Sequence, residues 1–328
     1  MRLNILIFTL FIALTQVNAQ FIITPDTAIC LGSEVTISAF SNSPESTPSL
    51  IGTDDVHSDP IDIGFDFTFY GNSYSQCLIS SNGYITFDLE NNGGFSPWTY
   101  DAPVPNPTQV PENAILAPWH DLDPLQGGNI VSGNYGTAPN RVFYIVWCNL
   151  PMYNCNNLID NQYIKLFESS NIIEMHLGSK PICEGWAGGT AIQGIVNENS
   201  TLFEIVTDPV LNQPRNFPLQ WTAEDEGWEF VPNDDFTSYD ISMIPFSPVT
   251  TGIISWSDQF GNFLENGLLT SVTPEIVGEN YYYISIEDVC TGEFLTNIDS
   301  VLIQVAPPTF AGADSTVFLC NSDDIVDL

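Results

Sequence analysis

Short segments in which apolar and polar residues alternate recur along the chain, and they predict β-strands. The clearest examples lie at residues 64–71, 77–88, 141–150, 172–178 and 191–196. Alternation with a period of two places neighbouring side chains on opposite faces of a strand, so that one face can be buried. Helical periodicity is nearly absent, and 23 glycines and 23 prolines punctuate the chain. The pattern predicts an all-β protein built from β-sandwiches.

Several residues are predicted to point into a core because they alternate along a strand. They are Phe65, Phe67 and Phe69; Tyr282, Ile284 and Ile286; and Val301, Ile303 and Val305. Trp256 lies in an earlier strand at residues 253–257, which together with the later strands predicts a small immunoglobulin-like sandwich. Asn82 and Gly83 suit a turn that requires positive φ.

The chain divides into five predicted parts. They are a signal peptide at residues 1–19, an N-terminal β segment at 20–50, a large β-sandwich at 51–235, an immunoglobulin-like or PKD-like domain at 236–307, and the start of a further, truncated immunoglobulin-like module at 308–328. The last part rests on a weak repeat, because residues 312–328 resemble residues 24–39. We therefore expect the sequence to be a fragment of a longer chain.

The first twenty residues predict export. Arg2 lies near the start, an apolar run occupies residues 5–14, and the small residues Val17 and Ala19 follow. This is the pattern of a secretory signal peptide that is cut after Ala19. Because a run of about ten residues is too short to span a bilayer as a helix, we expect a secreted or cell-surface protein that is not inserted in a membrane after cleavage.

The charge balance limits the partners of the protein. Lys and Arg number 5 and Asp and Glu number 40, which gives a net charge of −35, or −36 once Arg2 is removed. Such a surface repels phosphate backbones, so the composition argues against nucleic acid as a partner. The acidic residues either form a solvated surface or recruit divalent cations, calcium being the expected cofactor where there is one.

Seven cysteines lie beyond the predicted signal peptide, and export permits them to form disulfides. Cys148 and Cys155 are close enough in sequence to staple a single turn, and this is the first predicted pair. Two further pairs are predicted, Cys77 with Cys183 and Cys30 with Cys290. The odd number leaves one cysteine over, and we expect it to be Cys320.

Catalytic motifs are not found. The three histidines, His57, His120 and His176, are far apart in sequence, and His120 is expected to pack beside Trp119. The segment GWAGG at 185–189 lacks the serine of a nucleophile elbow. We therefore expect a protein that is not an enzyme, with no catalytic residues.

Pairs of aspartates are the strongest candidates for a site. They are Asp54 with Asp55, Asp121 with Asp123, and Asp234 with Asp235. Carboxylates and loop carbonyls are the ligands that calcium prefers, and Asp121 and Asp123 form the best candidate calcium site. The alternative is a glycosidase, which would need two convergent carboxylates in a cleft, one of them with a raised pKa.

Aromatic residues near predicted loops offer a different site. They are Trp98, Tyr100, Trp119, Trp186, Trp221 and Trp228. Rings exposed at the edge of a sandwich can hold sugars, whereas large side chains more often fill a core. The sequence leaves both alternatives open.

The segment IGFDFTFYGNSYSQCLISSNGYITFD at 63–88 resembles the opening of nidogen-like extracellular domains. The resemblance continues in ILAPWHDLDP at 115–124, which is similar to their Pro-aromatic-x-Asp segment. It implies that the large sandwich is a nidogen-like domain.

Segments at 140–155, 162–201 and 215–233 are similar to a domain of large Bacteroidota surface proteins, the gliding-motility-associated or type IX secretion substrates. There the domain precedes immunoglobulin-like or PKD-like repeats. The resemblance covers about residues 21–305. It implies a non-enzymatic adhesion or structural module that meets the outer-membrane secretion machinery during export and then binds a glycan or protein ligand. The alternative is a carbohydrate-binding accessory region of a secreted hydrolase.

Overall fold

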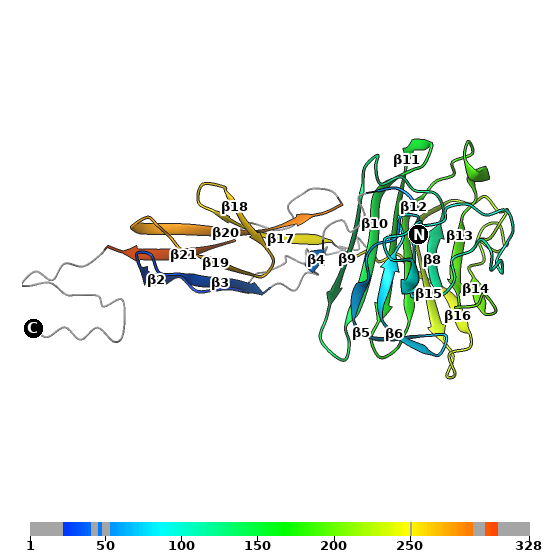
Figure 1. Cartoon of the computed structure of the whole chain (residues 1–328), viewed down its shortest axis with the longest axis horizontal. Coiled ribbons are helices and arrows are strands. Elements are labelled where there is room, and N and C mark those ends of the chain that lie inside the picture. Colours follow the sequence, from blue (N-terminus) through cyan, green and yellow to red (C-terminus); the bar gives the residue numbers. More distant parts are fainter. Residues whose placement is uncertain (1–21, 41–44, 48–52, 250, 291–298, 308–328) are drawn as a thin grey trace, which may run out of the picture.

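The computed structural model describes residues 22–40, 45–47, 53–249, 251–290 and 299–307 (Figure 1). Strands joined by turns make up this part of the chain, and its helices are two short 3₁₀ turns, η1 (Leu89–Asn91) and η2 (Ala187–Gly189). None of its helices has the length and apolar character needed to cross a membrane. The predicted all-β fold is confirmed. The predicted signal peptide and the predicted further module at 308–328 lie outside the described residues.

The large sandwich has two antiparallel sheets, whose strands run across the long axis of the molecule in Figure 1. The first sheet contains β9 (Asn129–Tyr135), β10 (Val142–Met152), β11 (Cys155–Phe167), β12 (Ile173–Lys180), β15 (Ala223–Pro232) and β16 (Tyr239–Pro245). The second sheet contains β5 (Ile61–Phe69), β6 (Asn72–Ile79), β7 (Tyr84–Thr86), β8 (Ala114–Trp119), β13 (Ile192–Val196) and β14 (Phe203–Ile205).

The core of the large sandwich follows the alternation of the sequence. Phe65, Phe67 and Phe69 of β5 are all buried, as their period predicts, and they pack with side chains of β10, β11 and β12 from the facing sheet. The intervening Asp66 is exposed and Thr68 is only partly buried. Burial of these large rings supplies much of the apolar area that holds the sheets together.

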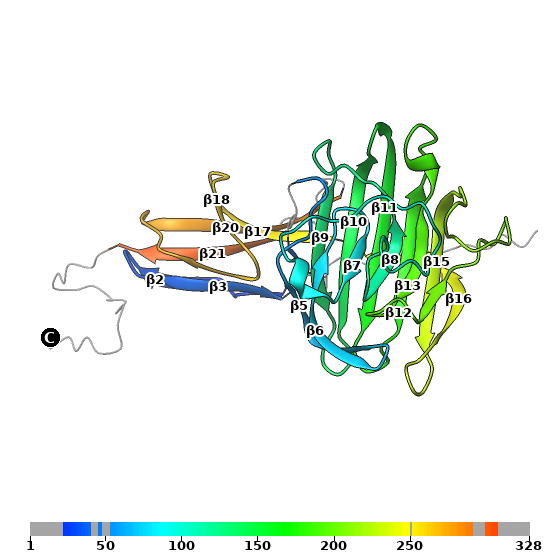
Figure 2. The ribbon, with the colours of Figure 1, turned by 45° about the vertical axis from the view of Figure 1, so that its right-hand side comes forward.

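The small sandwich has strands that run along the long axis of the molecule (Figures 1 and 2). One layer contains β1 (Ile22–Ile23), β3 (Val35–Phe40) and β19 (Leu269–Val272). The other contains β18 (Phe263–Asn266), β17 (Gly252–Asp258), β20 (Gly278–Asp288), β21 (Asp299–Ala306) and β2 (Thr27–Cys30). Trp256 is buried at its centre, as are all the residues predicted to face inward from β20 and β21.

Strands from both ends of the described chain build the small sandwich. β2 pairs in parallel with β21, and β3 pairs antiparallel with β19. The segment predicted as a separate N-terminal part at 20–50 therefore supplies strands to the same sandwich as residues 252–306. The large sandwich is inserted between these strands in the sequence.

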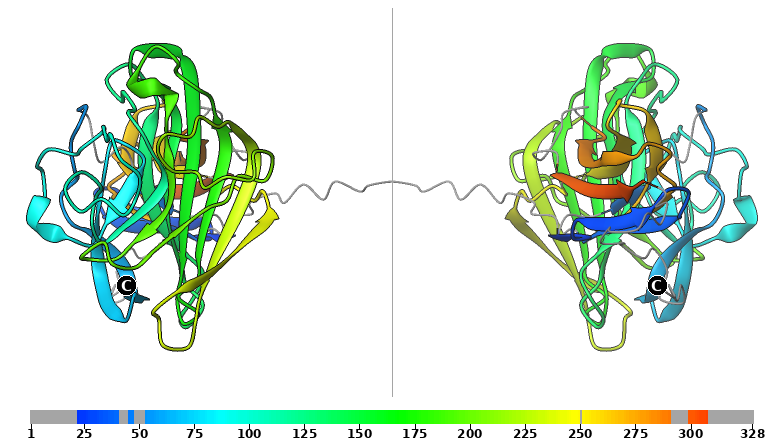
Figure 3. Two further views of the ribbon diagram at one scale, coloured as in Figure 1. Left: turned by 90° about the vertical axis from the view of Figure 1, so that its right-hand side faces the viewer. Right: turned by 90° about the vertical axis from the view of Figure 1, so that its left-hand side faces the viewer.

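The boundary after the large sandwich lies further along the chain than residue 235. β16 pairs with β15 along its whole length: Glu226 lies opposite Pro245 at one end, and Pro232 lies opposite Tyr239 at the other. The large sandwich therefore continues to Pro245. Figure 3 shows this yellow hairpin at one side of the sandwich, opposite β5 and β6. The acidic turn at 233–238 looked like a domain end in the sequence but closes a hairpin.

Two connections join the sandwiches. The short strand β4 (Glu45–Thr47) pairs with β9 of the large sandwich and with β17 of the small one, so one sheet passes through both. Cys148 of β10 forms a disulfide with Cys290, which follows β20. The junction is thus fixed by hydrogen bonds and by a covalent bond.

All three predicted disulfides are wrong. Cys148 pairs with Cys290, and Cys155 pairs with Cys183. Met152 of β10 lies opposite Cys155 of β11 in the hairpin. Cys148 is four residues away from Met152 along the extended β10 strand, which is about 13 Å. Cys148 is therefore too far from Cys155 for a disulfide.

Cys77 and Cys30 do not form the other two predicted disulfides. Cys77 is a buried free thiol, so it does not pair with Cys183, and Cys30 is disulfide-bonded but not to Cys290. The expectation that Cys320 has no partner falls outside the described residues.

The basic side chains of the described residues all have ion-pair or hydrogen-bond partners within the large sandwich. Arg141 pairs with Glu168, Lys165 with Glu174, and Arg215 with Asp208 and Glu226. The fourth, Lys180, is buried, donates from Nζ to the carbonyl oxygen of Trp221 at 2.9 Å, and lies 4.7 Å from the centre of that ring. Each of these four side chains is already paired or hydrogen-bonded, so none of them is free to offset the other acidic groups.

We predict that the Cys148–Cys290 disulfide stabilises the protein more than Cys155–Cys183 does. The two bridges span 142 and 28 residues. Chain-entropy arguments give about 5 and about 3.6 kcal/mol for loops of these lengths. Urea unfolding of C148A/C290A and of C155A/C183A measures the difference, and an equal or reversed order would contradict the prediction.

We predict that stability rises with pH because of Lys180. Burial lowers the pKa of Lys180 to about 7 from its ordinary 10.5, so between these values the unfolded chain binds a proton that the folded chain does not. Each pH unit in that window adds about 1.4 kcal/mol to the free energy of unfolding. Urea unfolding between about pH 7 and about pH 9 should show this rise in the wild type, and K180M should lack it. Equal slopes in the two proteins would refute the assignment to Lys180.

Candidate functional site

Carboxylates from two separate loops meet in the large sandwich. Asp54 and Asp55 precede β5, and Asp121 follows β8. One carboxylate oxygen from each lies within 4.8 Å of one from each of the others. Asp121, a predicted calcium ligand, therefore lies together with Asp54 and Asp55, which sequence analysis had identified only as a separate pair. We call Asp54, Asp55 and Asp121 the acid cluster.

The turn between β6 and β7 holds the two loops together. The side chain of Asn82 donates to Oδ1 of Asp55 at 2.9 Å and accepts from the backbone N–H of Leu122 at 3.1 Å. Gly83 follows with φ of +80°, and a side chain there would meet Gln162 and the carbonyl of Pro118. The predicted turn is confirmed at Gly83, and Asn82 has the further role of a clamp, which sequence analysis missed.

Asp121 is the most buried member of the acid cluster. Only 6% of the residue is exposed. Its Oδ2 accepts a hydrogen bond from the indole nitrogen of Trp186 at 2.6 Å, whereas its Oδ1 is buried and has no hydrogen-bond partner among the described residues. A buried carboxylate oxygen without a partner is costly unless it is protonated or bound to a cation.

The carboxylates of the acid cluster repel one another. Burial, followed by repulsion from neighbouring aspartates, raises the pKa of Asp54 to about 6. Burial also raises the pKa of Asp121 to about 7, repulsion adds to this, and the Trp186 hydrogen bond opposes it. The pKa of Asp55 is raised too, mainly by burial. The cluster therefore favours species that bring positive charge.

Asp123, the second predicted ligand, lies beside the acid cluster and adds to its negative potential. It is buried, and its Oδ1 accepts from the backbone N–H of Leu125 at 3.1 Å. Its charge contributes to the raised pKa values of Asp54 and Asp121. The third predicted pair, Asp234 and Asp235, is exposed in the β15–β16 hairpin, where Asp235 caps its own turn.

Three partly exposed rings adjoin the acid cluster. Trp186 stacks on Trp98 with ring centres 5.5 Å apart and contacts Tyr153 at 4.9 Å. Trp119, Trp221 and Trp228 are buried, so they are core residues. Tyr100 is partly buried and packs on Trp119.

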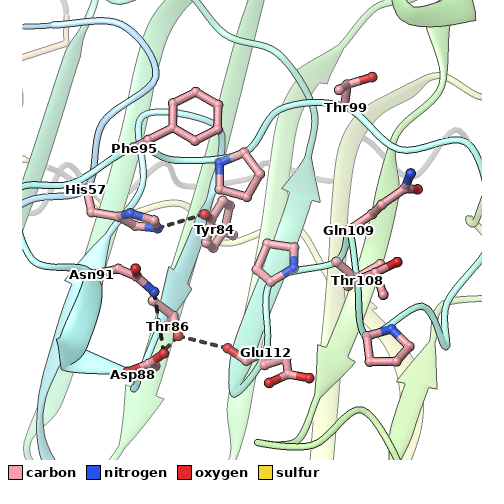
Figure 4. Close-up of a pocket in the computed structure, with 14 residues that line it drawn as sticks. His57, Tyr84, Thr86, Asp88, Asn91, Phe95, Thr99, Thr108, Gln109 and Glu112 are labelled. Atoms are coloured by element: carbon pink, nitrogen blue, oxygen red, sulfur yellow. Dashed lines mark hydrogen bonds between the residues drawn. The ribbon is translucent and has the colours of Figure 1, made fainter.

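The large sandwich also has a polar cleft of about 470 Å³, whose lining side chains are drawn in Figure 4. Its lining is formed by His57, Tyr84, Thr86, Asp88, Asn91, Phe95, Pro97, Thr99, Pro107, Thr108, Gln109, Val110, Pro111 and Glu112. In Figure 4 His57, Asn91 and Phe95 lie on one side, facing Thr108 and Gln109. Phe95 is 66% exposed. The cleft thus offers hydroxyl, amide and carboxylate groups beside an accessible ring.

His57 forms part of the buried wall of the cleft. Its Nε2 lies 2.7 Å from the hydroxyl of Tyr84, and its Nδ1 has no hydrogen-bond partner among the described residues. Burial lowers the pKa of His57, so the ring is neutral at neutral pH. A neutral ring and a hydroxyl suit an uncharged polar ligand.

One segment, residues 95–99, connects the cleft with the acid cluster. Phe95, Pro97 and Thr99 line the cleft. Between them, the carbonyl of Ser96 accepts from Asn82, and Trp98 stacks on Trp186. Alternate residues of this segment therefore face two sites.

The other histidines are found in separate buried pairs. His120 Nε2 lies 3.1 Å from Asp160, and His176 Nε2 lies 2.9 Å from Glu174. His120 lies at the bend that directly follows Trp119, and its ring is buried, where it pairs with Asp160 of β11.

The fold and these sites define an all-β sandwich protein with a polar cleft and an acid cluster that share the segment at residues 95–99. A family model described as NIDO related matches residues 33–226, more than half of the chain. The chain belongs to this NIDO-related family. The match includes both the cleft and the acid cluster, and it confirms the nidogen-like domain that the motifs at 63–88 and 115–124 predicted. A comparison with curated proteins found no match.

Proposed function

We propose that this protein is a non-enzymatic extracellular adhesion module that binds a glycan in the polar cleft. The observation that carries the proposal is the lining of the cleft, where amide, hydroxyl and carboxylate groups surround an exposed ring. Sugars present hydroxyl groups along their edges and apolar C–H faces, which such groups and rings complement.

The architecture supports a role in adhesion. Loops and strand β7 line the cleft, and the sandwich that carries them is joined to its neighbour through β4 and through Cys148–Cys290. Binding residues placed on loops of a rigid scaffold keep their geometry when a ligand pulls on them. A module of this kind can transmit load from the cleft to whatever follows the small sandwich.

The cellular setting is part of the proposal. Two disulfides are compatible with an extracellular protein. Together with the leader-like N-terminus, and with the resemblance to Bacteroidota surface proteins, they support export by a type IX route, presentation at the cell surface and a link with gliding motility.

Phe95 tests the adhesion proposal. After a glycan-array screen identifies a ligand for the wild type, we expect F95A to bind it about tenfold more weakly, because the stacking surface of the cleft is lost. Isothermal titration calorimetry measures the affinity. F260A is the matched control, since Phe260 is 69% exposed but lies in the small sandwich. Unchanged binding by F95A, or no ligand on the array, would count against a glycan site in this cleft.

A glycoside hydrolase is the second candidate, and one observation favours it. The acid cluster brings carboxylates together and raises the pKa of Asp121 to about 7, as a general acid requires. The three carboxylates do not line the polar cleft, which is why adhesion comes first.

The hydrolase alternative predicts turnover. If it holds, the wild type releases reducing sugar from the array ligand and D121N loses more than 99% of that activity, about a hundredfold effect for a lost acid catalyst. Release at the rate of the buffer alone would remove this candidate.

A further inference from the structure

We propose that Asp54, Asp55 and Asp121 form a calcium-binding site in the large sandwich. The inference goes beyond the glycan cleft, because a cation site can exist whether or not the cleft binds a sugar. Its members come from two loops that the fold brings together, one before β5 and one after β8.

The spacing of the carboxylates fits an ion of calcium's size. Calcium lies 2.3–2.6 Å from its oxygen ligands, so two ligands of one ion are at most about 5 Å apart. The three carboxylates satisfy this limit, since their closest oxygens all lie within 4.8 Å of one another. Magnesium usually keeps several of its waters and is bound by one or two carboxylates, so a set of three carboxylates suits calcium better.

A second observation points to a ligand independently of the acidity of the loops. Asp121 is more than nine-tenths buried, and Trp186 fixes its carboxylate through Oδ2 while Oδ1 has no partner among the described residues. Buried polar atoms in proteins are almost always satisfied. A cation between the carboxylates would satisfy Oδ1 and would offset the repulsion from Asp54 and Asp55.

The residues that the structure describes offer no basic counter-charge to this cluster. The basic residues that the structure describes form ion pairs or hydrogen bonds elsewhere: Arg141 with Glu168, Lys165 with Glu174, Lys180 with Trp221, and Arg215 with Asp208 and Glu226. Asp123 adds further negative charge nearby. The charge that balances the cluster must therefore come from protons or from solution.

The site is also pre-formed, which favours binding. Asn82 joins the two loops through its side-chain amide, and the backbone N–H of Asp55 donates to Oδ1 of Asp54 at 3.0 Å. Because these hydrogen bonds order the loops before an ion arrives, little conformational entropy is lost on binding.

Terbium luminescence and thermal melting test the site on the purified chain after chelator treatment. Trp186 touches Asp121, so a terbium ion bound there should be sensitised by tryptophan excitation. We expect a saturable signal in the wild type that calcium displaces and an equal concentration of magnesium does not. Calcium should also raise the melting temperature by at least ~3 °C.

The variants decide whether the signal belongs to this site. D121N keeps an acceptor for Trp186 and should weaken terbium and calcium binding at least tenfold. D54N/D55N, in a partly exposed loop, gives the same test if D121N does not fold. D234N/D235N is the matched control. It removes two aspartates that are neighbours in sequence but lie outside the acid cluster, so this variant should bind terbium and calcium as the wild type does. No saturable signal, or binding and melting that are the same in the wild type and both cluster variants, would overturn the proposal.

Discussion

The pairing of the first described strands with the last is the constraint on which this molecule depends. β2 must lie beside β21, and β3 beside β19, for the core around Trp256 to close. The chain leaves the small sandwich after β3, forms the large sandwich, and returns to the small one at β17. The large sandwich is therefore held at both of its ends, and β4 and the Cys148–Cys290 bridge reinforce the same junction. A loop site on such a body keeps a defined orientation toward the rest of the chain.

Local pattern predicted the strands but not their partners. The period-two runs at Phe65–Phe69 and in β20 and β21 identified the buried faces correctly, because burial of alternate residues depends on the strand alone. The pairings that close the small sandwich, β2 with β21 and β3 with β19, join segments far apart in the sequence, which no local pattern encodes. The disulfides show the same limit: Cys155 is near Cys148 in sequence, yet the hairpin register carries them apart, and Cys148 meets Cys290 across the junction between sandwiches.

The sequence identified one member of the acid cluster but not its partners, because the partners come from a different loop. Asp121 could be selected because closely spaced aspartates in a loop suit calcium, but its partners are determined by the turn at Asn82 and Gly83. That turn needs glycine for its positive φ and for the close approach of Gln162. Only when it is formed does the amide of Asn82 reach both Asp55 and Leu122. The contribution of Trp186 has no signal in the sequence, since a tryptophan beside glycines fits a loop or a core equally well.

The two proposed sites share one mechanical element, the segment at residues 95–99. Its alternate residues line the cleft and contact the clamp and ring that support the acid cluster. The side-chain amide of Asn82 donates both to Asp55 of the acid cluster and to the carbonyl of Ser96, so one group contacts the cluster and this segment. In the proposed calcium site, a cation would offset the repulsion among the carboxylates and favour the arrangement in which Trp186 donates to Asp121 and stacks on Trp98. If both proposals hold, calcium binding would order the contacts beside residues 95–99 and, with them, the side of the cleft that carries Phe95.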